Sequence, residues 1–246
     1  MSLLGLSGVG KRYEGSGDAI EVLRDLDFDI YGGEFVGIWG SEGAGRTTFA
    51  RIAAGLEAPT AGTVEYIGED IARLALEDRV RLWRYGIAWL DAEGPADEQI
   101  TARAYVAEPL VGREERSHAL ERASQALENF ELGEVLDECW ADLEDVDRAI
   151  AEIVRALLRL PKLLVLDDLT ARIHFDECEY VMSVLRRLAE EKLLGVLLTT
   201  SKMSDLLHVH RFAWLSDGQL IEPRPGGPIA KRLRAVPLDG TEDLTP

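Results

Sequence analysis

Residues 40–48 constrain this chain more than any other segment, because they read Gly-Ser-Glu-Gly-Ala-Gly-Arg-Thr-Thr. Their spacing matches the pattern G-x-x-x-x-G-K-[ST] of phosphate-binding loops, with Arg46 in the place of the lysine. The three glycines let successive backbone N–H groups face one point, and a helix starting near Thr47 directs its positive end there. The hydroxyl of Thr47 is placed to ligate Mg²⁺. The predicted phosphate contacts are Gly40, Ser41, Glu42, Gly43, Ala44, Gly45, Arg46, Thr47 and Thr48.

The surroundings of this loop favour a phosphate site over a ligand-free glycine-rich turn. The preceding residues 34–39 are apolar enough for a buried strand, and Gly55 suits the C′ position of the following helix. Arg46 keeps the positive charge of a lysine but presents a planar fork in place of a compact ammonium. The sequence leaves open whether the Glu42 side chain points into the loop or out to solvent.

Composition narrows the class of protein. A chain of 246 residues with 46% hydrophobic content is expected to form one large domain or a domain with a subdomain. Its net charge of −18 argues against nucleic acid and against an anionic membrane surface as partners.

Cys139 and Cys178 match no metal-binding spacing, so we expect two buried, reduced thiols. No signal peptide is evident, and no apolar run approaches the roughly 20 residues that span a bilayer. We therefore expect a cytoplasmic protein, either free or peripheral on the inner face of the membrane.

Buried strands alternate with helical segments, which predicts an α/β fold with a mixed, largely parallel sheet and flanking helices. The predicted strands are 22–30, 34–39, 63–67, 86–90, 163–166, 193–199, 211–215 and 219–222. The first two are expected to be joined by a turn at 31–33, and the last two form a hairpin. The predicted helical segments are 71–84, 114–130, 142–160 and 175–191.

The chain is expected to divide into a core with an inserted subdomain. Residues 95–150 carry no strand signal and should form a small helical subdomain, whereas 1–94 and 151–222 form the α/β core. Residues 223–246 are rich in proline and glycine and are expected to form a loose tail.

Up to about residue 222, these motifs and their spacing resemble the ATP-binding cassette (ABC) family of transport ATPases. Residues 74–110 are closest in pattern to its macrolide-exporter and lipoprotein-releasing branch. The resemblance implies a P-loop NTPase fold of the ABC nucleotide-binding type, with Mg²⁺ and ATP or ADP as ligands. It also implies a membrane permease or a competent second ABC subunit as partner.

The resemblance assigns roles to three further residues. Tyr13 stands where the family stacks an aromatic ring on adenine, although packing on an edge strand explains a tyrosine there equally well. Asp167, at the end of strand 163–166, matches the Walker B aspartate and would hold Mg²⁺ together with Thr47. Asp91 replaces the glutamine that ends the family's corresponding strand, and its carboxylate is a third candidate Mg²⁺ ligand.

Two catalytic positions depart from the family. Its catalytic glutamate is Asp168 here, a weak candidate base because the shorter side chain lengthens a water-activating contact by roughly 1 Å. Its switch histidine is Ser201, whose hydroxyl cannot replace an imidazole that reaches the γ-phosphate. His174 stands where the family has the aspartate of its D-loop.

The family signature Leu-Ser-Gly-Gly-Gln is replaced by Leu-Glu-Asp-Val-Asp at residues 143–147. In the family this segment opens a helix that faces the γ-phosphate on a second subunit. Carboxylates stabilise their own helix start by up to about 1 kcal/mol each, but a like-charge pair at about 4 Å costs roughly 4 kcal/mol at an effective dielectric of 20. A hydrogen bond to a charged group returns only about 1.5–3 kcal/mol. We therefore expect an acid-capped surface helix and no ATP-sandwich homodimer.

Three functional hypotheses follow. The first is a degenerate ABC nucleotide-binding protein that binds ATP or ADP weakly and hydrolyses it slowly or not at all. The second is a working ABC transport ATPase that tolerates its substitutions. The third is a scaffold or regulatory protein that keeps the fold only for interaction and binds no nucleotide.

Overall fold

The computed structural model describes residues 2–14, 19–91 and 93–223, and its centre is a six-stranded sheet. The strand order is β10-β9-β3-β8-β7-β6, and every pair is parallel except the β9–β10 hairpin. The strands are β3 (Phe35–Trp39), β6 (Ile87–Leu90), β7 (Leu163–Asp167), β8 (Gly195–Thr200), β9 (Arg211–Ser216) and β10 (Gln219–Ile221). The predicted mixed, largely parallel sheet is confirmed.

The register of this sheet brings three loops together. Strands β7 and β8 are nearly continuous apolar runs because both of their faces are buried. Asp167 at the end of β7 lies opposite Thr199, and Trp39 at the end of β3 lies opposite Thr200. The segments after β3, β7 and β8 therefore leave one edge of the sheet side by side.

A second, antiparallel sheet has the order β2-β1-β4-β5. Its strands are β1 (Leu4–Tyr13), β2 (Ile20–Ile30), β4 (Ala61–Tyr66) and β5 (Glu69–Asp70). The predicted turn at 31–33 exists, but the strands it joins, β2 and β3, belong to different sheets. Strand β1 was not predicted, because three glycines and several polar residues interrupt its apolar alternation.

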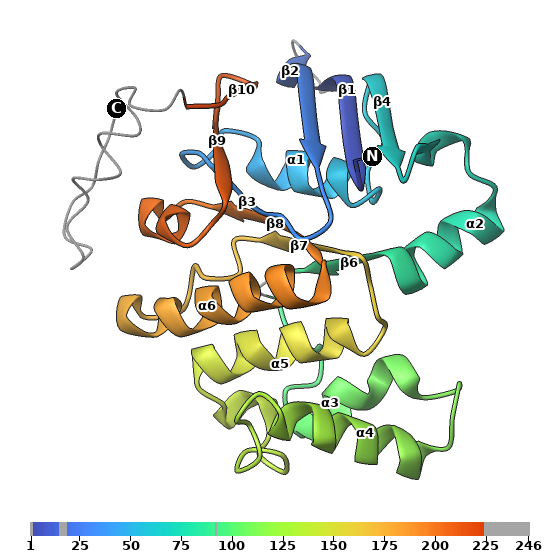
Figure 1. The fold of residues 1–246 in the computed structure, drawn as a ribbon, viewed down its shortest axis with the longest axis vertical. Coiled ribbons are helices and arrows are strands. Elements are labelled where there is room, and N and C mark those ends of the chain that lie inside the picture. The colour runs from blue at the N-terminus through green and yellow to red at the C-terminus, as the bar shows by residue number, and fades with distance from the viewer. Residues whose placement is uncertain (1, 15–18, 92, 224–246) are drawn as a thin grey trace.

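Helices lie on both sides of the six-stranded sheet (Figure 1). Helix α1 (Arg46–Ala53) lies between the two sheets, and α6 (Phe175–Lys192), α5 (Asp145–Leu157), α4 (Arg116–Glu128) and α3 (Ala102–Ala107) lie on the other side. Helix α2 (Leu76–Arg81) lies at the outer edge. The six-residue α3 was not predicted, because it is too short to show a helical period. Short 3₁₀ or π turns cover Ile71–Arg73, Leu82–Gly86, Glu108–Leu110, Trp140–Asp142 and Met203–Leu207.

Two apolar cores lie on opposite faces of the six-stranded sheet. One joins α1 to the antiparallel sheet, with Phe28 and Phe49 in an edge-to-face contact at 5.7 Å between ring centroids. The other joins α3–α6 to the opposite face. The division into 1–94 with 151–222 and a helical subdomain 95–150 remains a proposal, and its boundary at 150 falls inside α5.

Three further expectations concern the cysteines, the C-terminal tail and membrane-spanning helices. Both cysteines are free thiols, but only Cys178 is buried, whereas Cys139 is half-buried at a helix margin. The expected tail at 223–246 lies outside the described residues except for Pro223. Among the described helices, none combines the length and the apolarity that a bilayer crossing requires.

Candidate nucleotide-binding site

The loop between β3 and α1 has a backbone that only glycine fits. Gly45 has φ of 96°, and a Cβ there would lie 2.8 Å from Val22 Cγ1. A Cβ on Gly40 would lie 2.8 Å from the carbonyl oxygen of Leu215. Helix α1 starts at Arg46, so its positive end faces this tight turn. The backbone therefore fits a phosphate, while Ser41, Glu42 and Thr47 are exposed at its rim.

The Arg46 side chain folds back across the loop and is 12% exposed. Its Nη1 donates to the carbonyl oxygen of Gly40, and its Nη2 lies 3.0 Å from Asp168 Oδ2. The planar fork of arginine makes both contacts at once, whereas the single ammonium of lysine has no such geometry. The loop cation is thus tied to the candidate catalytic carboxylate.

Asp168 also contacts Ser201. Its Oδ1 accepts from the backbone N–H of Ser201 at 3.3 Å and from Ser201 Oγ at 3.4 Å. Asp168 has φ of 53° and donates its own N–H to Thr199 O at 3.0 Å. Three positions that differ from the family thus meet in one group, which we call the Arg46–Asp168–Ser201 cluster. Both carboxylate oxygens of Asp168 therefore accept hydrogen bonds from within the cluster.

Two of the predicted metal ligands, Thr47 and Asp167, lie at the start of α1 and at the end of β7. Asp167 Oδ1 accepts from Thr199 Oγ1 at 2.5 Å, and the Thr47 hydroxyl is exposed at the loop. Within the described ranges, no three His, Cys, Asp or Glu side chains are grouped to hold a metal ion. A Mg²⁺ ion bound to Thr47 and Asp167 would take its remaining oxygen ligands from nucleotide phosphates and water.

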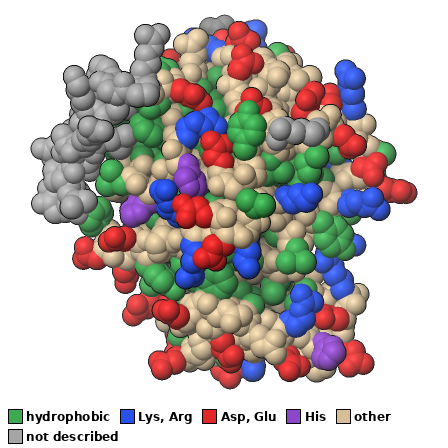
Figure 2. Space-filling view, viewed as in Figure 1, with side chains coloured by type: hydrophobic (Ala, Val, Ile, Leu, Met, Phe, Trp, Pro, Cys, Tyr) green, Lys and Arg blue, Asp and Glu red, His purple; other side chains and the backbone are tan. Residues whose placement is uncertain are grey.

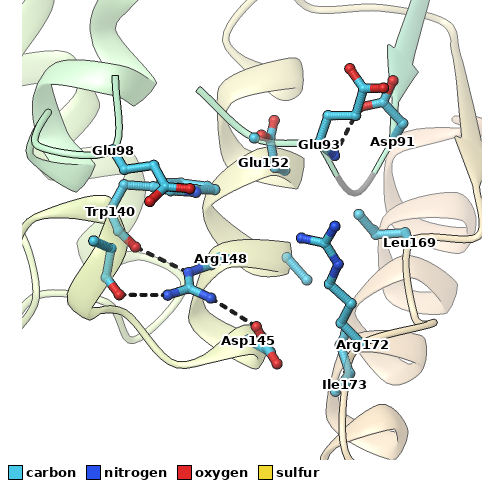
Figure 3. Close-up of a pocket in the computed structure, with 13 residues that line it drawn as sticks. Asp91, Glu93, Glu98, Trp140, Asp145, Arg148, Glu152, Leu169, Arg172 and Ile173 are labelled. Carbon is cyan, nitrogen blue, oxygen red and sulfur yellow. Dashed lines mark hydrogen bonds and ion pairs between the residues drawn. The ribbon is translucent and has the colours of Figure 1, made fainter. Parts of the chain in front are cut away.

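Asp91 opens onto a different cleft, of about 230 Å³ (Figure 3). Its carboxylate accepts from Trp89 Nε1 at 2.9 Å and from the backbone of Glu93 at 3.2 Å. Thr47 and Asp167 do not line this cleft, so a metal role for Asp91 stays a prediction. The charged residues that line it are Asp91, Glu93, Glu98, Asp145, Arg148, Glu152 and Arg172.

Helix α5 begins with the acidic residues predicted for it. Asp145 is paired with Arg148, whose Nη1 lies 2.9 Å from Asp145 Oδ1 and whose other nitrogens donate to backbone carbonyls of 140 and 141. Burial raises the pKa of Asp147, and the carboxylates of Glu144, Glu138 and Glu177 raise it further. The start of the helix therefore carries carboxylates that repel one another.

We predict that Asp147→Asn stabilises the fold at neutral pH. A carboxyl whose pKa is raised on folding destabilises the native state above that pKa, and this penalty disappears as pH falls towards the unfolded value. The stability gain of Asp147→Asn over wild type should therefore shrink between about pH 7 and pH 4. Urea denaturation at several pH values measures it. A gain that does not change with pH would contradict this account.

Tyr13 lies beside α1, at the edge of the loop. Its hydroxyl donates to Glu57 Oε1 at 2.7 Å and lies 3.3 Å from Thr48 Oγ1. Lys11 lies 5.0 Å from the ring centroid and 2.8 Å from Glu57 Oε1. The ring is held at its hydroxyl end and is 40% exposed, and its stacking on adenine stays a prediction.

Sequence reasoning missed Asp205, which is 1% exposed. One oxygen accepts from Thr170 Oγ1 and from Thr200 Oγ1, both at 2.6 Å. Burial raises its pKa although both hydroxyls oppose the shift. Lys202 Nζ donates nearby to the carbonyl of Thr170 at 2.6 Å. Asp205 thus braces the turn that carries Ser201. No local pattern marks it, because Thr170 lies in the turn after β7 and Thr200 ends β8.

We predict that Asp205→Ala lowers the free energy of unfolding by about 2–4 kcal/mol, because two buried hydroxyls lose their acceptor. Asp205→Asn keeps an oxygen acceptor at that position and should lose less than half as much. Urea denaturation of both variants measures the difference. Equal losses would mean that the acceptor is not what matters.

Comparison with known proteins identifies the family. Residues 23–171, more than half of the chain, match the family described as ABC transporter. The chain belongs to the ABC transporter family. This ABC protein is 28% identical to the lipoprotein-releasing system ATP-binding protein LolD of Pseudomonas syringae pv. tomato, over 90% of this chain and 98% of the relative. It is 29% identical to the macrolide export ATP-binding/permease protein MacB of Syntrophobacter fumaroxidans, over 96% of this chain and 34% of that protein.

Among solved structures, a dimeric bacterial ABC transporter cassette matches this ABC protein with a TM-score of 0.79 and 25% identity. The match covers 88% of this chain and 96% of the cassette. The expected family and fold class are confirmed. The expectation that no ATP-sandwich homodimer forms meets one finding against it, because a cassette of this fold is dimeric.

Proposed function

We propose that this ABC protein is the nucleotide-binding subunit of a membrane transporter and that it binds Mg-ATP or Mg-ADP weakly and hydrolyses ATP slowly. Its family and its relatives support the transport role. The single observation that carries the slow turnover is the Arg46–Asp168–Ser201 cluster.

Weak binding is supported by the contacts of Arg46. Phosphate oxygens need the cationic side chain of the loop, but here it is bonded to Gly40 and Asp168. A hydrogen bond to a charged group contributes about 1.5–3 kcal/mol, so turning Arg46 towards a phosphate loses part of what the phosphate gains. The carboxylate of the exposed Glu42 only accepts hydrogen bonds, so it offers no donor to a phosphate.

Slow hydrolysis is supported by three features of the same cluster. Asp168 is one methylene shorter than a glutamate, both of its oxygens are engaged, and Ser201 offers a hydroxyl in place of an imidazole. A well-positioned general base contributes about 10²–10⁴-fold in rate. The acidic start of α5 adds repulsion towards a phosphate on a second subunit.

Calorimetric titration of the purified chain with Mg-ATP at millimolar concentration tests the binding claim. We expect saturable binding that Thr47→Ala weakens, because the threonine hydroxyl is the proposed metal contact. Heat without saturation up to millimolar nucleotide would reject the proposal in favour of a nucleotide-free scaffold.

A second candidate is an ATP-hydrolysing subunit of ordinary rate. The match over 98% of LolD, a protein named as the ATP-binding protein of a lipoprotein-releasing system, favours it. In that case Asp168 is the working base in spite of its contacts, and Asp168→Asn abolishes hydrolysis. An Asp168→Asn variant that hydrolyses ATP at the wild-type rate would reject this candidate.

The proposed partner is a membrane permease or a second ABC subunit, which would place this ABC protein on the inner face of the membrane. The relative MacB is named as an ATP-binding and permease protein, and this chain corresponds to 34% of it. Carboxylates are spread over the face in Figure 2, among lysines and arginines. The net charge of −18 disfavours nucleic acid as a partner. Co-purification of a tagged chain with a membrane protein tests the partner.

A further inference from the structure

A cavity of about 260 Å³ lies between the end of α1, strand β4 and the residues from 70 to 83. It is separate from the Arg46–Asp168–Ser201 cluster, since none of those three residues lines it. Its segment 70–83 includes α2, at the outer edge of the molecule in Figure 1. The larger apolar side chains that line it are Ile52, Leu56, Pro59, Val64, Ile71 and Trp83. The cavity therefore suits a compact apolar body.

Arg79 is the only lysine or arginine among the described residues that line this cavity. Its Nε is buried, and no described residue accepts a hydrogen bond from it. Its Nη2 makes only a long contact of 3.4 Å to the carbonyl of Ala72. A buried donor without an acceptor is costly, because it has lost water and gained nothing. Arg79 thus brings a positive charge to the lining of the cavity, and its buried Nε–H has no acceptor among the described residues.

The two carboxylates at the rim of this cavity are already paired. Glu57 contacts Lys11 at 2.8 Å and accepts from Tyr13 at 2.7 Å. Asp70 accepts from the backbone of Ala72 at 2.9 Å and lies 3.2 Å from Arg73. Neither needs a cationic ligand, and both would repel a multiply charged anion. The charges therefore favour a single negative charge, placed at Arg79.

We propose that this cavity binds a small monocarboxylic acid, with the carboxylate at Arg79 and an aliphatic or aromatic body against Trp83 and Ile71. Carboxylates match the guanidinium fork geometrically, and such charge-assisted contacts are the stronger hydrogen bonds. The volume of about 260 Å³ lies just below the range of about 300–1,000 Å³ that is usual for ligand pockets, which limits the body to a short chain or one ring.

Octanoate is the probe, and octanamide is its uncharged control. In ¹H–¹⁵N spectra of the full chain, the Nε–H resonance of Arg79 is identified by its loss in Arg79→Met. We expect octanoate to shift this resonance saturably and octanamide to bind at least tenfold more weakly. Arg79→Met should weaken octanoate binding at least tenfold, whereas Arg81→Met, at an exposed residue of α2 outside the lining, should leave it unchanged.

Ala72→Phe provides a second variant, since Ala72 lines the cavity and is exposed, so a larger side chain fills the mouth without removing Arg79. We expect it to abolish octanoate binding while the fold persists. The proposal is overturned if the Arg79 resonance does not move with octanoate. It is also overturned if octanamide binds equally well, or if the filled variant binds as the wild type does.

Discussion

Arg46→Lys is expected to raise the affinity for Mg-ATP about tenfold. A lysine ammonium cannot bridge the Gly40 carbonyl and Asp168 with the fork that Arg46 uses. In the free wild-type protein, this charged hydrogen bond contributes about 1.5–3 kcal/mol, which nucleotide binding must overcome. The variant lacks it, and a difference of about 1.4 kcal/mol changes a dissociation constant tenfold. Calorimetric titration of wild type and variant with Mg-ATP measures the change.

The matched control for this change is Arg51→Lys, at the other end of α1. Arg51 is half-exposed and pairs with Glu57 at 3.6 Å, so the same substitution there should leave ATP affinity unchanged. An Arg46→Lys variant that binds ATP as weakly as the wild type, or more weakly, would show that the bridge to Asp168 does not limit binding.

Restoring both catalytic positions is expected to raise ATP turnover about 100-fold. The variant carries Asp168→Glu and Ser201→His together with Arg46→Lys, in a chain whose residues 144–147 are changed to Ser-Gly-Gly-Gln. The longer carboxylate, freed from Arg46, reaches an attacking water, and the imidazole supplies a γ-phosphate contact that a hydroxyl cannot. Release of inorganic phosphate at saturating Mg-ATP gives the rate.

The chain with only residues 144–147 changed separates the two causes of slow turnover. If this chain alone gains the full 100-fold, repulsion at α5 is the limiting factor and the cluster is not. If the complete variant remains as slow as the wild type, while it stays folded and binds ATP, the account of hydrolysis is wrong.

Much of the fold could be predicted because its determinants are local. Residues 40–48 specify a strand–loop–helix turn through glycines alone, and the apolar runs of β7 and β8 mark buried parallel strands. Asp167 and Asp168 follow from their place at the end of β7. Strand β1 escaped prediction because its glycines break the alternation, and its pairing partners β2 and β4 supply what local propensity lacks.

The contacts within the site could not be predicted in the same way. Arg46 and Asp168 are 122 residues apart, and only the folded sheet places the end of β7 beside the loop. The direction of a long arginine side chain is decided by the acceptors around it. The sequence alone does not show which acceptors these are. Asp205 is hidden for the same reason, since Thr170 and Thr200 become its partners only after β7 and β8 pair.

One experiment tests the central claim most directly: Mg-ATP binding and steady-state phosphate release are measured on the same purified wild-type chain. The account predicts saturable binding together with a turnover far below about 1 s⁻¹, the lower end of ordinary enzyme rates. Saturable binding with turnover at or above about 1 s⁻¹ would contradict it, because Asp168 would then act as a competent base while bonded to Arg46 and Ser201.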